Sequence, residues 1–294
     1  MKTPRLMPDE LAAGDFRSLA RALSFVENNE DSAAAFLASL APKNVPVIGI
    51  TGPPGAGKST LVQGLATWLS RQGKRVAILA VDPTSPFNFG SLLGDRIRMS
   101  ALFTDPNIYI RSLATRGSLG GLSARTLEMT DVLRSAGFDL VIVETVGVGQ
   151  SEIEIAGLAD RTVLVLVPES GDEIQHIKSG IMEIAQAFVV NKADREGADL
   201  FYNNLLKLVH GAPERVPVFR TIASKNDGLV PLAEWLLQPV NLPVERRALL
   251  LTERAWKMIA EKRMRSLDKE TLRAEIKKGL RGPDFNLYRL VQHL

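Results

Sequence analysis

The stretch Gly52-Pro53-Pro54-Gly55-Ala56-Gly57-Lys58-Ser59, followed by Thr60, decides the fold of this chain. It fits the pattern G-x-x-x-x-G-K-[ST] and follows an apolar run, residues 45–51, that is typical of a buried strand. Apolar residues then recur at helical spacing, at Leu61, Leu65, Trp68 and Leu69. A strand before the motif and a helix after it favour a phosphate-binding loop over an ordinary Gly/Pro turn. In such a loop, glycines let successive N–H groups surround an anion at the start of the helix. We therefore predict that Lys58 reaches the β- and γ-phosphates of a nucleotide and that the Ser59 hydroxyl binds Mg²⁺.

Composition narrows the classes of protein to consider. The 294 residues are 45% hydrophobic, which is typical of a globular chain, and they include no cysteine, which excludes disulfides and thiolate metal sites. A net charge of +3 is too small to indicate nucleic-acid binding. Residues 1–11 carry no apolar signal segment, and no later run is apolar for long enough to span a bilayer. We expect a cytoplasmic protein with neither nucleic acid nor membrane as a partner.

Seven apolar runs alternate with helical patterns along the chain. The strand candidates are residues 45–51, 75–81, 108–111, 140–144, 162–167, 187–191 and 216–221. Their nearly continuous Val, Ile and Leu content suits a sheet that is covered on both faces. Residues 124–136 and 198–209 have the period and length of crossover helices. The pattern predicts an α/β fold of the P-loop NTPase type, with a mostly parallel sheet flanked by helices and ligands at the carboxyl ends of the strands.

Helical patterns also lie on either side of this alternating region. Two of them occupy residues 8–41, and Pro42 stops them. At the other end, Pro239 and Pro243 bracket a boundary, and residues 244–279 are helical and rich in Lys and Arg. We therefore predict an N-terminal helical extension at 1–43, a nucleotide-binding domain at 44–238 and a C-terminal helical dimerisation region at 239–294.

Asn191-Lys192-Ala193-Asp194 follows a predicted strand and fits N-K-x-D, the motif with which GTPases read guanine. A fixed carboxylate at Asp194 can accept from both the ring N–H and the amino group of guanine, a donor pair that adenine lacks. Asn191 would hold the loop, and the stem of Lys192 would cover the base. Further along, Ala223 and Ser224 lie where a GTPase loop supplies backbone N–H groups to the guanine carbonyl.

Acidic residues at strand ends predict the metal site. Glu144 ends the run 140–144, where P-loop enzymes place a carboxylate for Mg²⁺, and Gly147 lies where a backbone N–H senses the γ-phosphate. Asp82 ends another run, and Asp95 lies in Leu-Leu-Gly-Asp-Arg, where a helix N-cap is an equal alternative. Both can join the metal shell directly or through water.

No residue is an obvious group to orient the attacking water. Val148 stands close to the position where Ras-like enzymes carry a glutamine, with Gln150 nearby. Arg98, Arg111 and Arg116 are conceivable charge stabilisers, although surface or structural roles are the simpler interpretation. We therefore expect slow intrinsic hydrolysis that a partner accelerates.

The motifs taken together resemble a metallochaperone-type P-loop GTPase, and within that group the MeaB/ArgK family. The resemblance covers nearly the whole chain and rests on the loop at 52–59 with VDPTS at 81–85, ETVGVGQSE at 144–152, GDEIQHIKSG at 171–180 and NKAD at 191–194. It implies a GTPase chaperone of adenosylcobalamin-dependent acyl-CoA mutases, typically methylmalonyl-CoA mutase. Such a chaperone gates delivery of the cofactor from an adenosyltransferase and helps to clear inactivated cofactor, so adenosylcobalamin belongs to the client.

The resemblance also implies roles for single residues. Lys58 and Ser59 become phosphate and Mg²⁺ ligands, with Asp82, Asp95 and Glu144 as the acids around the metal and Lys58, Asp82 and Glu144 as the catalytic set. Asp172, Gln175 and Lys178 become reporters of the nucleotide state that face the mutase, whereas their polarity alone indicates a solvated loop. Family members are usually homodimers through their C-terminal helices. The segment Pro168-Glu169-Ser170 departs from the small residues expected there.

Three other interpretations compete with this one. A binding module that has lost hydrolysis is the first, and the intact residues Lys58, Ser59 and Glu144 argue against it. A nickel-insertion accessory GTPase needs Cys and His ligands, but the chain has no Cys, and His176, His210 and His293 are scattered. A kinase of a transport-related protein, a label attached to some ArgK members, needs a base placed for an acceptor hydroxyl, and no residue stands out as one.

Overall fold

The computed structural model describes residues 8–28, 30–41, 43–82, 99–114, 124–145, 151–171, 184–210, 216–240, 244–264, 267–282 and 285–292. The chain divides into two compact units, Met1–Arg247 and Ala248–Leu294. The N-terminal helices and the predicted nucleotide-binding domain fall in the first unit, and most of the predicted dimerisation region forms the second.

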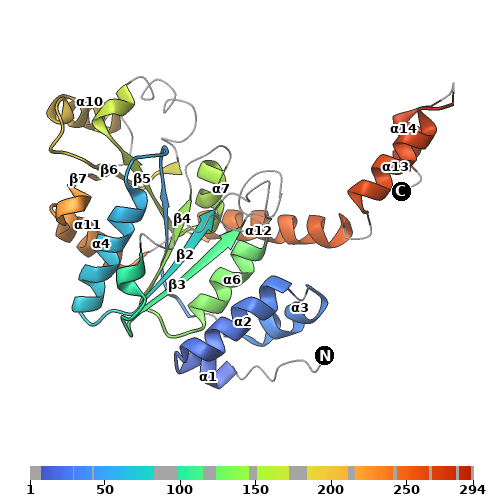
Figure 1. The fold of residues 1–294 in the computed structure, drawn as a ribbon, viewed down its shortest axis with the longest axis horizontal. Coiled ribbons are helices and arrows are strands. Elements are labelled where there is room, and N and C mark those ends of the chain that lie inside the picture. Colours follow the sequence, from blue (N-terminus) through green and yellow to red (C-terminus); the bar gives the residue numbers. More distant parts are fainter. Residues whose placement is uncertain are drawn as a thin grey trace. The chain divides into compact units, whose positions relative to one another are not determined.

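A seven-stranded parallel sheet forms the centre of the first unit (Figure 1). Its strands are β1 (Val47–Thr51), β2 (Val76–Asp82), β3 (Ile108–Ala114), β4 (Leu140–Thr145), β5 (Arg161–Leu166), β6 (Ala187–Val190) and β7 (Val218–Arg220). Their order across the sheet is β3-β2-β4-β1-β5-β6-β7. Each strand predicted from an apolar run is present with small shifts at its ends, and the predicted α/β fold is confirmed.

Helices cover both faces of the sheet, which explains why the strands are apolar on both sides. On one face, α4 (Lys58–Arg71) and α11 (Leu229–Leu237) pack on a core that includes Ile48 and Val163. The opposite face carries α6 (Ala124–Arg134), α7 (Ser151–Leu158) and α10 (Ala198–His210). Alternate residues of one strand enter different cores, since Val163 and Val165 join the α4 side whereas Leu164 and Leu166 join α10.

The N-terminal helices are part of the first unit. They are α1 (Pro8–Ala12), α2 (Phe16–Asn28) and α3 (Glu30–Ser39), and α2 packs against α6. Leu19 and Leu23 of α2 are fully buried in the same core as strands β2 and β4. The Arg75 guanidinium lies 5.6 Å from the Phe16 ring centre and 5.4 Å from that of Phe138. Apolar burial and cation–π contacts therefore join this extension to the sheet domain.

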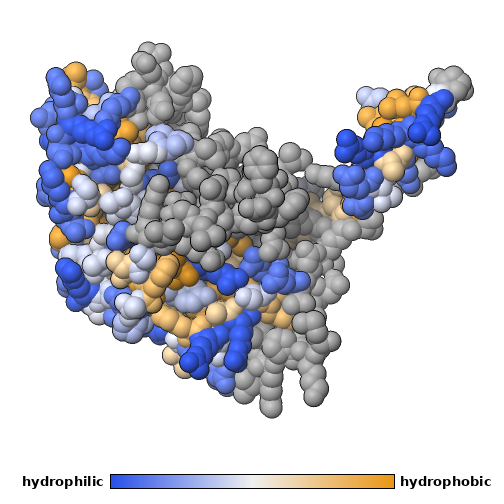
Figure 2. All heavy atoms as spheres, viewed as in Figure 1, coloured by the Kyte–Doolittle hydropathy of each residue, from blue (hydrophilic) through white to orange (hydrophobic). Residues whose placement is uncertain are grey.

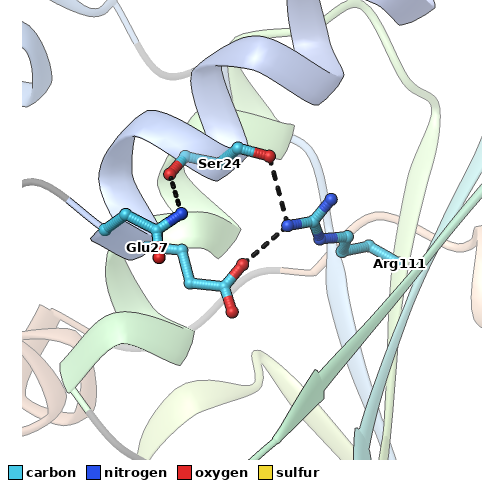
Figure 3. Close-up of polar contacts among 4 residues, drawn as sticks. Ser24, Glu27 and Arg111 are labelled. Carbon is cyan, nitrogen blue, oxygen red and sulfur yellow. Dashed lines mark hydrogen bonds and ion pairs between the residues drawn. The ribbon is translucent and has the colours of Figure 1, made fainter. Parts of the chain in front are cut away.

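A polar contact ties α2 to the edge strand β3 (Figure 3). Arg111 of β3 donates from Nη2 to Glu27 Oε2 at 2.6 Å and to Ser24 Oγ at 3.3 Å. Both side chains of the ion pair are largely buried, so the partners satisfy each other's charge. The structure thus gives Arg111 a role in holding the N-terminal extension rather than in stabilising phosphate charge.

The second unit consists of helices with exposed apolar side chains. It contains most of α12 (Val244–Met264), with α13 (Lys269–Gly279) and α14 (Leu287–Gln292). The helical pattern predicted over 244–279 is thus two helices, because Asp268 caps a new one by accepting from Thr271 N at 2.8 Å. Apolar atoms lie beside hydrophilic ones over α13 and α14 (Figure 2). Trp256 is 72% exposed and Tyr288 is 82% exposed.

Three short 3₁₀ turns complete the described elements: η1 (Ser100–Leu102), η2 (Pro168–Gly171) and η3 (Ala223–Lys225). None of the helices that the structure describes is both long enough and apolar enough to cross a membrane.

Leu23→Ala tests whether α2 belongs to the folding core. We expect this change to lower the free energy of unfolding by about 2–5 kcal/mol, because it removes buried methyl groups and leaves a cavity. Arg21→Ala on the exposed side of the same helix is the control and should change stability by less than about 0.5 kcal/mol. Urea unfolding followed by circular dichroism measures both. A Leu23→Ala protein as stable as the control would contradict this packing.

Candidate nucleotide site

The phosphate-binding loop joins β1 to α4 through three glycines with positive φ. Gly52, Gly55 and Gly57 have φ values of 141°, 77° and 87°. A Cβ atom on Gly52 would lie 2.1 Å from the Val165 carbonyl oxygen, and one on Gly57 would lie 2.4 Å from Asn191 Nδ2. Glycine is therefore required at both ends of the loop, by conformation and by close packing.

The start of α4 carries the groups that can hold an anion. No side chain caps this helix, so its first N–H groups remain available to a phosphate. Lys58 is buried, and its Nζ donates to the carbonyl oxygens of Gly52 at 2.8 Å and Pro53 at 3.0 Å. The ammonium thus lies inside the loop formed by residues 52–57.

Ser59 meets Glu144 at the carboxyl edge of the sheet. Because β4 pairs with β1 and Glu144 is in register with Ile50, its carboxylate lies beside the start of α4. Ser59 Oγ donates to Glu144 Oε1 at 2.6 Å, and Glu144 is only 7% exposed. At the next residues of β4 and β1, the Thr145 hydroxyl donates a hydrogen bond to Thr51 Oγ1 at 2.9 Å. A hydroxyl and a carboxylate are hard oxygen donors of the kind that Mg²⁺ prefers.

The other predicted metal and γ-phosphate residues are only partly described. Asp82 ends β2, which lies next to β4, so its backbone reaches the same edge of the sheet as Glu144. The side chain of Asp82 and the whole of Asp95 and Gly147 lie outside the described residues. Within the described part of the chain, no three His, Asp or Glu side chains gather as a metal site.

Asn191 links three segments of the site. Its Nδ2 donates to the Ala56 carbonyl oxygen at 2.8 Å, and its Oδ1 accepts from Thr221 Oγ1 at 3.0 Å and from Ala223 N at 3.1 Å. The side chain is 2% exposed, so these hydrogen bonds are shielded from water. The role expected for Asn191 as a loop holder now has specific partners, of which Thr221 was missed because a strand-end threonine gives no signal of its own.

The charged groups of Lys192 and Asp194 contact different partners. Lys192 has a φ of 55° and donates from Nζ to the Gly55 carbonyl oxygen at 2.7 Å. Asp194 Oδ2 accepts from Lys225 Nζ at 3.0 Å. This hydrogen bond is the main reason why the pKa of Asp194 lies below its usual value near 3.8. The carboxylate is therefore ionised at neutral pH, as guanine recognition requires.

A second ion pair involves Arg195, which follows Asp194 in the chain. Arg195 donates to Glu169, which stands in η2, and this contact lowers the pKa of the Glu169 carboxyl. Glu169 is one of the residues that depart from the family pattern, and the structure shows what it contacts. The predicted reporters Asp172, Gln175 and Lys178 follow η2 but lie outside the described residues, as do Arg98, Arg116, Val148 and Gln150.

Gly57→Ala tests the contact between the phosphate loop and Asn191. We expect this variant to lose most nucleotide binding, because the added methyl group displaces the Asn191 amide as well as straining the backbone. Gly55→Ala is a matched control, since Gly55 lies in the same loop and also has a positive φ, 77°, but a Cβ there meets no atom within 4 Å. Titration with fluorescent GDP measures the difference. Equal loss of affinity in both variants would mean that backbone strain alone is responsible.

Comparison with known proteins shows the family of this chain. Residues 19–277 match the family described as methylmalonyl-CoA mutase-associated GTPase MeaB. A Pyrococcus horikoshii protein named as a GTPase is 48% identical over 235 residues, which cover 77% of this chain and 74% of that one. The Escherichia coli GTPase ArgK is 42% identical over 190 residues, which cover 63% of this chain and 57% of the relative.

A mouse protein and a solved structure are also similar to this chain. The mouse methylmalonic aciduria type A homolog, a mitochondrial protein, is 42% identical over 196 residues, which cover 63% of this chain and 46% of that protein. A solved structure described as a LAO/AO transport system kinase superposes with a TM-score of 0.69 at 25% identity, over 93% of this chain and 89% of the other. On the extent of the family match, this chain belongs to the MeaB family of methylmalonyl-CoA mutase-associated GTPases and is itself a GTPase.

Proposed function

We propose that this GTPase gates the delivery of adenosylcobalamin to methylmalonyl-CoA mutase or a related acyl-CoA mutase, and protects or reactivates that enzyme. The observation that carries the nucleotide part is the set of hydrogen bonds through which Asn191 joins the phosphate loop to the two base-reading segments. The client part is supported by the family, which is named for its association with methylmalonyl-CoA mutase. The product that matters is then a conformational change in the client.

Guanine recognition is assigned to Asp194 and to the turn η3. Asp194 accepts from the ring N–H and the amino group of the base. The Ala223 N–H already donates to Asn191 Oδ1, and the Lys225 N–H donates to the Ile222 carbonyl oxygen. We therefore assign the Ser224 N–H to guanine O6, with Ala223 holding the turn in place. Lys192, anchored on Gly55, would cover one face of the base.

Phosphate binding is assigned to residues 52–60, and Mg²⁺ binding to Ser59, Asp82, Asp95 and Glu144. The donor pair Ser59 and Glu144 fits the metal, because both offer oxygen and their contact is 2.6 Å. Bound Mg²⁺ would offset negative charge on the β- and γ-phosphates. Lys58 would exchange its bonds to loop carbonyls for bonds to phosphate oxygens, and the Gly147 N–H would face the γ-phosphate.

Slow intrinsic hydrolysis and stimulation by the client follow from the lack of a recognisable group to orient water. Adenosylcobalamin stays with the mutase and with the adenosyltransferase that supplies it, so this chain needs no cobalamin site of its own. We propose a homodimer formed through residues 239–294, which the exposed apolar side chains Leu249, Trp256 and Ile259 support.

The competing functions gain no support from the part of the site that the structure describes. A nickel carrier requires a soft or imidazole ligand set, whereas the contact at the nucleotide site consists of serine and glutamate oxygens. A kinase requires a free base for an acceptor hydroxyl, whereas Glu144, the acid beside the phosphate loop, is buried and accepts from Ser59.

GTP hydrolysis in the presence of a mutase tests the proposal. We expect an adenosylcobalamin-dependent methylmalonyl-CoA mutase to raise the turnover number about tenfold or more with GTP, and to have no effect with ATP. Lys58→Ala should lower turnover by about 100-fold or more, because it removes a cation from the transferring phosphates. Phosphate release measures both. A mutase that binds but leaves the rate unchanged would refute the chaperone assignment and leave the GTPase intact.

Lys178→Ala tests the assignment of the reporter residues. We expect basal hydrolysis to change less than twofold and the stimulated rate to fall toward the basal one, because Lys178 is assigned to the client contact and not to the phosphates. Lys207→Ala, an exposed lysine of α10, controls for the loss of one positive charge. Paired rate measurements with and without the mutase decide this. An equal loss in both conditions would place Lys178 in the catalytic site.

A further inference from the structure

The ammonium group of Lys225 contacts the Asp194 carboxylate, which is assigned to guanine recognition. Lys225 Nζ lies 3.0 Å from Asp194 Oδ2, and 63% of the Lys225 side chain and 39% of the Asp194 side chain are exposed. A base that approaches from solvent would therefore meet an ammonium donor and a carboxylate acceptor side by side. The motif N-K-x-D describes the acceptor alone.

Backbone contacts hold both partners in place. Lys225 ends η3, and its N–H donates to the Ile222 carbonyl oxygen at 2.8 Å. On the other side, the Ala193 N–H donates to the Thr221 carbonyl oxygen at 3.0 Å, which joins the loop of Asp194 to the strand end that precedes η3. The two backbone segments that carry the ammonium and the carboxylate are thus held next to each other.

The neighbouring cations are directed elsewhere. Lys192 donates to the Gly55 carbonyl oxygen, and Arg195 forms its ion pair with Glu169. Lys225 is therefore the lysine that the structure places on the Asp194 carboxylate.

We infer that Lys225 determines base specificity together with Asp194, by donating from its ammonium group to guanine O6, whose second lone pair accepts from the Ser224 N–H. This inference rests on the guanine site proposed above. Guanine presents an acceptor, O6, next to a donor, the N1–H, and the pair Lys225–Asp194 presents a donor next to an acceptor. Since a carboxylate oxygen has two lone pairs, Asp194 Oδ2 can accept from guanine while Lys225 stays close.

Adenine would fit the same pair badly. It carries an amino group where guanine carries O6, and an unprotonated N1 where guanine carries N1–H. Lys225 would then face a donor, and Asp194 would face an acceptor. Buried or partly buried polar groups that lack a partner reduce affinity more than a good hydrogen bond raises it. Lys225 thus adds discrimination at O6, at the opposite end of the base edge from the amino group that Asp194 reads.

A different role for Lys225 predicts the opposite result. If the lysine merely occupies the carboxylate, it competes with guanine, and its removal should tighten binding. If instead it only orients the carboxylate toward the amino group of guanine, its removal should weaken GTP more than ITP, which lacks that amino group.

Dissociation constants of Lys225→Met for GTP, ITP and ATP with Mg²⁺ separate these roles. Methionine keeps an unbranched stem that can pack on the base but lacks the ammonium. We expect GTP and ITP to bind about 3- to 10-fold more weakly, by equal factors, and the GTP preference over ATP to fall. Lys207→Ala should bind all three nucleotides like the parent protein. Thermal unfolding confirms that each variant is folded.

Asp194→Asn in the same experiment distinguishes this inference from the proposed site. Loss of guanine preference in Asp194→Asn together with unchanged binding by Lys225→Met would overturn the role of Lys225 and leave the site standing. No change in either variant would overturn the guanine site itself. Tighter GTP binding by Lys225→Met, or a weakening confined to GTP, would also overturn donation to O6.

Discussion

The hydrogen bonds of the Asn191 side chain are the constraint on which the nucleotide site depends. This one amide joins the phosphate loop at Ala56 to Thr221 and Ala223, which lie far from that loop in the sequence. Because the group is almost completely buried, each bond lost would leave a polar atom without water. These hydrogen bonds therefore fix the distance between the phosphate loop and the turn η3, to which we assign the base. Such preorganisation reduces the ordering that binding would otherwise require.

The parallel sheet makes this arrangement possible. β1 lies between β4 and β5, so the phosphate loop at its end has Glu144 on one side and the strands leading to Asn191 on the other. The close approach of Gly57 to Asn191 then forbids a side chain at the glycine, so the sequence pattern of the loop follows from contacts across the sheet. A phosphate and a base can be bound at one edge because all the strands end there.

Sequence alone was enough for the sheet and for the positions of the main motifs. Nearly continuous apolar runs predicted all seven strands, and the runs are clearest in central strands such as β1 and β6, which are buried at every position. The partners of charged side chains were not predictable. Arg111 stands 84 residues from Glu27, and Lys225 stands 31 residues from Asp194, so neither pair follows from local spacing. The helix break before Asp268 was missed, although aspartate is a preferred residue at the start of a helix.

The two ends of the site differ in how their charges are treated. At the phosphate end, Lys58 and Glu144 are buried and hydrogen-bonded, so their charges act at short range through a medium of low polarity. At the base end, Asp194 and Lys225 are partly exposed, and solvent weakens their attraction. We therefore expect binding strength to come mainly from the phosphate end, whereas the exposed base end contributes mainly to the choice of base. A weak, exposed ion pair suits the role proposed for Lys225, because its ammonium group can turn toward guanine O6 without losing a strong contact to Asp194.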